Sequence, residues 1–307
     1  MCESCGCSDG ARATVINLQT GVTTEIAADH ALSHHHHGHD HHDADHAHGH
    51  DHHHHQSHAH THHHPHDHGH MVALGEAVLR KNDELAVRNR AWFAGREILA
   101  LNLVSSPGAG KTTLLERTIG ECGGSHAFSV IEGDQATAND AERIRAAGAP
   151  VVQINTGTGC HLEADMVARA LKELAPAFGS VVMIENVGNL VCPALFDLGE
   201  QAKAAIISVT EGEDKAVKYP HIFQASRLVL INKIDLLPHL RFDIALCVQN
   251  IRMVNPFAEI LQVSATTGEG LEQWYAWIAA QRKSAREQAF ALPAGDLAAG
   301  AEAATHF

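Results

Sequence analysis

Residues 105–113 read SSPGAGKTT, a glycine-rich stretch between an apolar run at 98–104 and a helical pattern at 112–121. This order of strand, glycine-rich turn and helix is the context of a P-loop, where backbone N–H groups and the helix dipole bind phosphate. Lys111 then reaches the β- and γ-phosphates, and Thr112 holds Mg²⁺. A glycine-rich turn with a chance lysine is the alternative, and the flanking strand and helix argue against it.

The motif departs from the consensus G-x-x-x-x-G-K-[ST] at its first position, which is Ser105. A serine side chain is small enough for such a turn, although a residue other than glycine narrows the allowed backbone angles. The remaining predicted phosphate-binding residues of this loop are Gly108, Gly110 and Thr113.

Short apolar runs without alternation recur along the chain, as in strands buried on both faces. Helical patterns lie between most of them, which predicts an α/β domain with a doubly wound, mainly parallel sheet. The ligand of such a sheet lies beyond the C-terminal ends of the strands. The predicted strands are 98–104, 127–131, 150–154, 180–184, 204–209, 228–231 and 259–263, with a short one at 15–18; the predicted helices are 72–92, 112–121, 139–147, 162–175, 242–254 and 271–285.

A second motif, NKID at residues 232–235, follows the predicted strand at 228–231. The carboxylate of Asp235 can accept two hydrogen bonds from N1–H and the N2 amino group of guanine, whereas adenine has no matching pair of donors. The sequence therefore predicts a guanine site. The other predicted residues of this site, which tie the loop to the P-loop or lie along the base, are Asn232, Lys233, Ser264 and Ala265.

Acidic residues follow two more strands at the same edge of the sheet. Glu185 begins the segment ENVG, in the place of a D-x-x-G switch, and Gly188 is expected to contact the γ-phosphate. Asp134 ends the segment EGD and is predicted to bind Mg²⁺ or to position the attacking water. A helix cap or a solvated turn is the alternative for each carboxylate alone, and their shared edge argues against it. The predicted catalytic residues are Lys111, Asp134 and Glu185.

The N-terminal 70 residues differ in composition from the rest. Residues 30–70 are almost wholly His, Asp, Ala, Gly and Ser and hold 23 of the 28 histidines. This His-rich tract has too little apolar surface to offset the entropy of ordering it, so it is predicted to be disordered. The predicted organisation is a Cys-rich terminus at 1–10, a linker with the His-rich tract at 11–70, a GTPase domain at 71–285 and a flexible tail at 286–307.

Charge and hydropathy exclude several classes of protein. The formal net charge is −14, which disfavours a general nucleic-acid-binding protein. No stretch reaches about 18 apolar residues, so no membrane span is expected, and the N-terminus lacks the features of a secretory signal. The cysteine count of seven is odd, which favours metal binding or burial over a disulfide scaffold. These features predict a cytoplasmic protein.

The first group of predicted metal ligands is Cys2, Cys5 and Cys7. Three closely spaced thiolates can form a compact site for Ni²⁺, and Zn²⁺ in a tetrahedral version is the competitor. The alternative is a merely reactive, oxidisable terminus. Because a flexible tract is expected to tether it, this cysteine motif is predicted to have no fixed position relative to the phosphates.

The second group is Cys160, His161 and Cys192, which follow strands at the phosphate edge. A switch that contacts the γ-phosphate would then move a metal ligand, so the nucleotide would control metal affinity. Three ligands leave Ni²⁺ or Zn²⁺ short of a full shell, which a dimer could close. Buried structural cysteines with a surface histidine are the alternative.

The third group is the His-rich tract itself. Its histidine runs never exceed four residues and are mixed with aspartate, which argues against a purification tag; a merely solvated tail is the other alternative. Neutral imidazoles on a flexible chain offer many weak, interchangeable sites, which suits storage of Ni²⁺. The predicted ligands in its longest runs are His34, His35, His36, His37, His52, His53, His54, His55, His62, His63 and His64.

These motifs resemble those of the SIMIBI class of P-loop GTPases, and within it the HypB family of hydrogenase nickel-incorporation GTPases. The resemblance is carried by CESCGC at 2–7, by the P-loop, by TGCHL at 158–162 and by ENVGNLVCP at 185–193. It covers residues 1–7 and roughly 79–283 and is highly specific.

The resemblance implies a GTP-hydrolysing metallochaperone that uses Mg²⁺ and delivers Ni²⁺ to the large subunit of [NiFe] hydrogenase. It also implies a GTP-dependent homodimer that works with a small zinc- and nickel-binding maturation partner. The related urease accessory GTPases are the nearest alternative, and the cysteine motifs favour the hydrogenase family. A nickel storage or detoxification protein is a second alternative, against which the complete set of nucleotide motifs argues.

Overall fold

The computed structural model describes residues 13–26, 68–134, 139–157 and 159–291. The strands are β1 (Thr14–Asn17), β2 (Thr23–Glu25), β3 (Leu99–Ser105), β4 (Phe128–Asp134), β5 (Val151–Asn155), β6 (Val181–Glu185), β7 (Ala202–Ser208), β8 (Ser226–Asn232) and β9 (Glu259–Gln262). The helices are α1 (His68–Gly95), α2 (Lys111–Cys122), α3 (Asn139–Ala146), α4 (Ala164–Leu174), α5 (Cys192–Leu195), α6 (Lys215–Lys218), α7 (Pro220–Ala225), α8 (Ile244–Val254) and α9 (Leu271–Ala291), with the 3₁₀ helix η1 (Ile234–His239).

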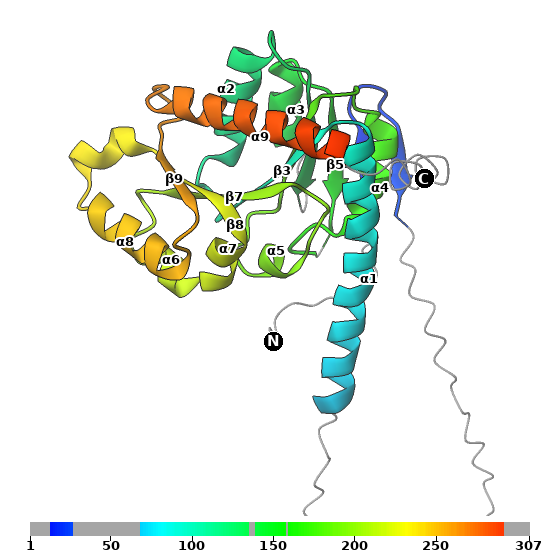
Figure 1. Cartoon of the computed structure of the whole chain (residues 1–307), viewed down its shortest axis with the longest axis horizontal. Coiled ribbons are helices and arrows are strands. Elements are labelled where there is room, and N and C mark those ends of the chain that lie inside the picture. The colour runs from blue at the N-terminus through cyan, green and yellow to red at the C-terminus, as the bar shows by residue number, and fades with distance from the viewer. Residues whose placement is uncertain (1–12, 27–67, 135–138, 158, 292–307) are drawn as a thin grey trace, which may run out of the picture.

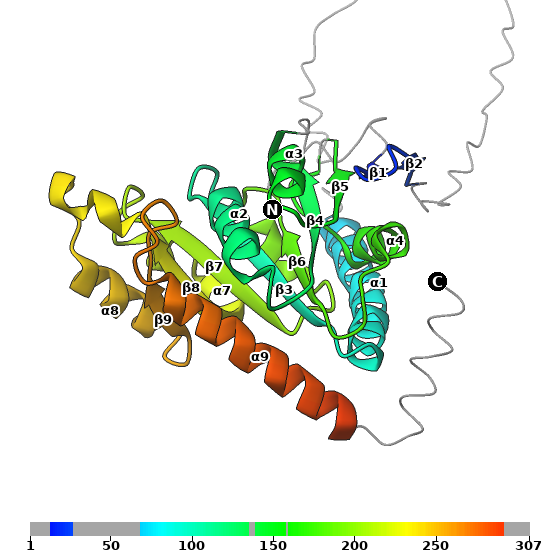
Figure 2. The same ribbon diagram turned by 90° about the horizontal axis from the view of Figure 1, so that it is seen from above.

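A single sheet runs through the middle of the domain, with strand order β2-β1-β5-β4-β6-β3-β7-β8-β9 (Figures 1 and 2). The seven strands from β3 to β9 are parallel, and all residues of β3 and β6 are buried. Apolar residues of α2, α3 and α9 pack on one face, while those of α1, α4, α7 and α8 cover the other. The prediction of a doubly wound, mainly parallel α/β sheet is confirmed.

The seven predicted parallel strands and the six predicted helices are all present, with boundaries shifted by a few residues. The short strand predicted at 15–18 is β1, but its partner β2 was missed because it is three exposed residues, TTE. Helix α9 runs to Ala291, six residues past its predicted end, since REQAFA contains good helix formers. No helix among the described residues is long and apolar enough to cross a membrane.

The β1–β2 hairpin forms the antiparallel edge of the sheet. Thr14 pairs with Asn155, the last residue of β5, so the chain enters β1 at the C-terminal edge of the parallel strands. Figure 2 shows this hairpin beside β5. The predicted flexible tether is therefore wrong for residues 14–25: the chain is fixed to the sheet seven residues after Cys7. Cys2, Cys5 and Cys7 lie outside the described residues, as do the tract histidines from His30 to His66.

Candidate functional site

A cavity of about 540 Å³ opens at the C-terminal edge of the sheet, where the motifs predicted it. The P-loop forms one wall, and the ends of β4 and β6 with residues 185–189, here called the switch segment, form the other. Gly108 and Gly110 take positive φ angles of 75° and 98°, which favour glycine. Lys111, Thr112, Thr113, Asp134, Glu185 and Gly188 all line this cavity, as predicted from the sequence.

Ser105, the departure from the P-loop consensus, contacts the motif's lysine. The Ser105 Oγ accepts a hydrogen bond from Lys111 Nζ at 2.9 Å, and both residues are buried. Burial lowers the pKa of Lys111, and nearby carboxylates, Glu185 foremost, act in the opposite direction. The serine thus satisfies a buried ammonium group at the floor of the phosphate site.

Two glutamates lie side by side below the P-loop. Glu132 and Glu185 are paired in register on the neighbouring strands β4 and β6, and both are buried. Thr112 Oγ1 donates to Glu185 Oε1 at 2.7 Å, whereas the Oε2 atoms of both glutamates have no hydrogen-bond partner among the described residues. Buried carboxylate oxygens beside a threonine hydroxyl are the hard oxygen ligands that Mg²⁺ prefers, so the donor set fits this ion.

The sequence prediction missed part of this site. It assigned the Mg²⁺ or water-positioning role to Asp134 and not to Glu132. The two residues are two positions apart on β4 and therefore lie on the same face of the strand. The structure places Glu132 against Glu185, and this register could not be derived from either segment alone. Asp140 and Arg143 of α3 also line the cavity, and Arg143 donates to Asp140, Glu116 and Thr113. Their sequence pattern is that of an ordinary exposed helix, so it did not indicate that they line a nucleotide cavity.

Glu132 makes the stability of the nucleotide-free protein depend on pH. Burial, and then the charge of Glu185, raise the pKa of Glu132 from 4.5 to about 9. The folded chain therefore binds this proton more tightly than the unfolded chain, so stability falls as pH rises from 4.5 to about 9. We expect Glu132→Gln to unfold at a higher temperature than wild type at pH 8.5 and to differ little at pH 5. Thermal unfolding at both pH values checks this, with exposed Glu272→Gln as control; parallel pH profiles for wild type and Glu132→Gln would contradict it.

The predicted base loop is joined to the P-loop. Asn232 Nδ2 donates to Ala109 O at 2.9 Å, and its Oδ1 accepts from Ala265 N at 3.1 Å. A Cβ on Gly110 would lie 2.6 Å from Asn232 Nδ2, so only glycine permits this approach.

The two charged residues of the base loop are also held in place. Lys233, with a φ of 63°, donates from Nζ to Gly108 O at 2.7 Å. Asp235 Oδ1 accepts from Ser264 Oγ at 2.5 Å, which orients its carboxylate.

Cys160, His161 and Cys192 come together beside the same cavity. Their ligand atoms lie within 4.8 Å of one another, and among the described residues this is the only group of three His, Cys, Asp or Glu side chains close enough to share one metal ion. The Sγ atoms are 2.9 Å apart, and Cys160 Sγ lies 3.7 Å from His161 Nδ1. Burial lowers the pKa of His161 to about 4, so the imidazole is neutral at pH 7 and available as a ligand.

The switch segment holds the loop that carries two of these residues. Asn189 Nδ2 donates to Cys160 O at 3.2 Å, and Asn186 Oδ1 accepts from Leu162 N at 3.3 Å. Cys160 itself lines the nucleotide cavity, and Glu185 directly precedes Asn186. The switch segment therefore lines the phosphate cavity and is also bonded to the loop that carries Cys160 and His161.

The chain is similar to known proteins over this domain. Residues 99–262 match the family model described as CobW/HypB/UreG, nucleotide-binding domain. The hydrogenase maturation factor HypB of Escherichia coli (strain K12) is 58% identical over 205 residues, which are 67% of this chain and 71% of that protein. HypB of Azotobacter vinelandii is 55% identical over 232 residues, 73% and 77% of the two chains.

Two solved structures are similar as well. The crystal structure of HypB from Archaeoglobus fulgidus has a TM-score of 0.62 at 36% identity, covering 66% of this chain and 99% of that one. That of HypB from Helicobacter pylori in complex with nickel has a TM-score of 0.62 at 35% identity, covering 66% and 96%.

Proposed function

The chain belongs to the HypB hydrogenase maturation factors of the CobW/HypB/UreG family, and from this premise we propose that GTP hydrolysis by it controls delivery of Ni²⁺ to the large subunit of a [NiFe] hydrogenase. One observation supports this most directly: Cys160, His161 and Cys192 cluster where two segments that border the phosphate cavity meet. A nucleotide-dependent movement there would change the metal site.

The residues of the cavity have separate roles in hydrolysis. Lys111 and the P-loop amides neutralise charge that develops on the phosphates, and Asp235 selects guanine. Thr112, Glu132 and Glu185 would hold Mg²⁺, which supplies further positive charge at the β- and γ-phosphates. Asp134, at the end of β4, would bind that ion or orient the attacking water.

Nickel is the cargo in this proposal. Thiolate and neutral imidazole ligands suit Ni²⁺, and Zn²⁺ competes for them. One chain supplies three ligands, so we propose that a GTP-dependent homodimer completes the shell. The cysteines of the N-terminal motif would form a second nickel site. The hydrogenase large subunit and a small zinc- and nickel-binding maturation protein would be the partners, in the cytoplasm.

The experiment that tests this function is disruption of the gene in its host. We expect hydrogenase activity to be lost and to return when the medium contains excess Ni²⁺, because high nickel bypasses a delivery factor. Complementation with the Cys160→Ala/Cys192→Ala variant should fail at low nickel. Loss of urease activity instead would indicate the urease accessory role, and altered nickel content with normal hydrogenase would indicate storage or detoxification.

The His-rich tract is proposed to store nickel without taking part in hydrolysis. We expect replacement of the histidines in 30–67 by serine to remove most of the Ni²⁺ bound per chain and to leave GTP turnover within about twofold of wild type. Replacement keeps the chain length between the β1–β2 hairpin and α1 unchanged. Metal analysis after equilibrium dialysis gives the stoichiometry, and full nickel capacity in the replaced protein would refute storage.

A further inference from the structure

The three clustered ligands come from two segments that are far apart in sequence. Cys160 and His161 precede α4, whereas Cys192 begins α5 and is followed by the loop 196–200. The metal site needs both segments at a fixed separation, and the bonds of Asn186 and Asn189 join them on the side of the nucleotide cavity. A second element that contacts both segments is α1, the first helix after the His-rich tract, which packs along α4 (Figure 1).

We propose that Asn82 and Asn89 of α1 are positioning residues for the Cys160–His161–Cys192 site; the inference rests on the proposed nickel function of that cluster. Asn82 Oδ1 accepts from Ala164 N at 2.9 Å, and its Nδ2 donates to Asp197 O at 2.8 Å. Each end of this one amide is therefore bonded to a different ligand-bearing segment.

Asn89 repeats the arrangement two turns further along α1, on the same face of the helix. Its Nδ2 donates to Ala164 O at 2.8 Å and to Leu198 O at 3.0 Å. Both asparagines are buried, so loss of either amide removes hydrogen bonds that are shielded from water. Ala164 lies three residues after His161, and Leu198 lies six after Cys192, so the two amides hold the segments together close to their ligands.

The loop that receives these bonds also supports the metal site directly. The Phe196 ring packs on the His161 ring, with centroids 3.9 Å apart, and Phe196 O accepts from Lys203 Nζ at 2.9 Å. A Cβ on Gly199 would lie 2.6 Å from Ala86 O, which shows how closely the loop follows α1. A displaced loop would therefore move both the imidazole's packing partner and the segment after Cys192.

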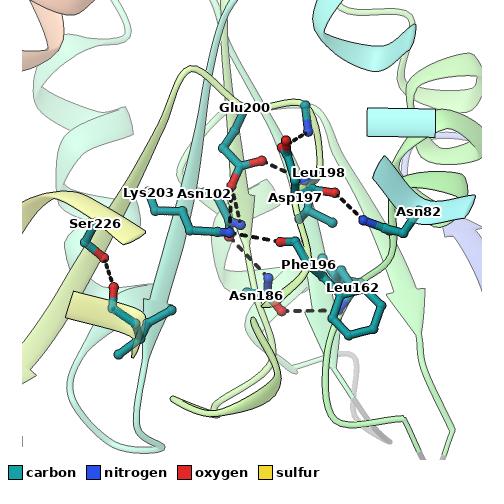
Figure 3. A network of polar contacts seen from close by, with 12 residues as sticks. Asn82, Asn102, Leu162, Asn186, Phe196, Asp197, Leu198, Glu200, Lys203 and Ser226 are labelled. Carbon is teal, nitrogen blue, oxygen red and sulfur yellow. Dashed lines mark hydrogen bonds and ion pairs between the residues drawn. The ribbon is translucent and has the colours of Figure 1, made fainter. Parts of the chain in front are cut away.

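The same loop is connected to the nucleotide switch by buried side chains, shown in Figure 3. Glu200 accepts from Leu198 N at 2.8 Å and from Asn102 Nδ2 at 3.1 Å. Asn102 Oδ1 accepts from Asn186 Nδ2 at 3.2 Å, and Asn186 is the switch residue that holds Leu162. Asn82 and Asn89 bond to Ala164, Asp197 and Leu198, none of which lines the nucleotide cavity, so their effects on metal and on nucleotide can be separated.

The test is a titration of Asn82→Ala and Asn89→Ala in the full chain with Ni²⁺. Binding at the Cys160–His161–Cys192 site is followed by the part of the thiolate-to-nickel absorption that disappears in Cys160→Ala/Cys192→Ala. We expect its affinity for Ni²⁺ to fall about 10–100-fold, as when a partner of a metal ligand is removed. GTP affinity should stay within about twofold of wild type.

Asn255→Ala is the matched control, because Asn255 is a buried asparagine that donates to the carbonyls of Phe223 and Ser226, at the end of α8. It should lower thermal stability without changing nickel affinity. Asn82→Asp keeps the acceptor for Ala164 N and replaces the donor to Asp197 O by a carboxylate oxygen, so it tests that bond separately from the one to Ala164 N.

Unchanged nickel affinity in the folded Asn82 and Asn89 variants, or a parallel loss of nickel and GTP binding, would overturn the inference. Absence of the thiolate component from wild type would instead contradict the proposed nickel site, and this inference with it.

Discussion

Replacing Asp235 by asparagine is expected to lower GTP affinity by roughly 100-fold and to raise affinity for xanthosine triphosphate. The carboxylate can accept two hydrogen bonds from guanine, each worth about 1.5 kcal/mol or more with a charged partner. Asparagine replaces one acceptor oxygen by an NH₂ donor, which matches the carbonyl of xanthine at the same place. Ser264 Oγ contacts Asp235 Oδ1 at 2.5 Å and fixes the side chain, so the altered pattern is presented in the same orientation.

Nucleotide titrations of wild type and Asp235→Asn with GTP, ATP and xanthosine triphosphate measure this change. Ser264→Ala should weaken GTP binding less, because it frees the carboxylate without altering its acceptors. Asp214→Asn is the control, since Asp214 lies on the surface in an ion pair with Lys218 and should leave all three affinities unchanged. Equal affinity of wild type for ATP and GTP would remove the guanine assignment.

Nickel affinity of the Cys160–His161–Cys192 site is expected to differ about 5–150-fold between the GTP and GDP states. Gly188 lines the phosphate cavity and Cys192 lies four residues beyond it, while Asn189 holds the backbone of Cys160. A switch segment that moves on contact with the γ-phosphate is therefore expected to move Cys160 and Cys192, two of the three ligands. By linkage, bound nickel must change the preference for GTP over GDP by the same factor.

The measurement is a Ni²⁺ titration in GDP and in a non-hydrolysable GTP analogue. The protein used carries serine in place of Cys2, Cys5, Cys7 and the histidines of 30–67. The nickel bound is then that of the Cys160–His161–Cys192 site. Substitution is preferable to deleting residues 1–70, because that deletion would remove β1, β2 and the start of α1. Asn189→Ala should reduce the coupling while Cys160 and Cys192 remain. Identical affinities in both nucleotide states would exclude the mechanism.

The parallel sheet and the nucleotide motifs could be predicted from the sequence because each depends on short-range pattern. Continuous apolar runs identify buried strands, and P-loop and NKID chemistry depends on residues a few positions apart. The same local reasoning placed Cys160, His161 and Cys192 at one edge, since the C-terminal ends of parallel strands meet there. It failed for β2, which has no buried residue, and for Asp140 and Arg143, which look like an ordinary exposed helix.

The sequence by itself therefore determined the fold class, and it predicted the motifs that line the cavity and the three side chains that cluster beside it. Only the tertiary structure decided that Glu132 pairs with Glu185, that β1 fixes the N-terminal segment beside Asn155, and that the amides of α1 hold the two ligand segments. These features depend on strand register and on helix packing between segments some 50 to 140 residues apart. Hydrophobic pattern specifies which face of an element is buried, but the partner across that face is set by the packing of the whole domain.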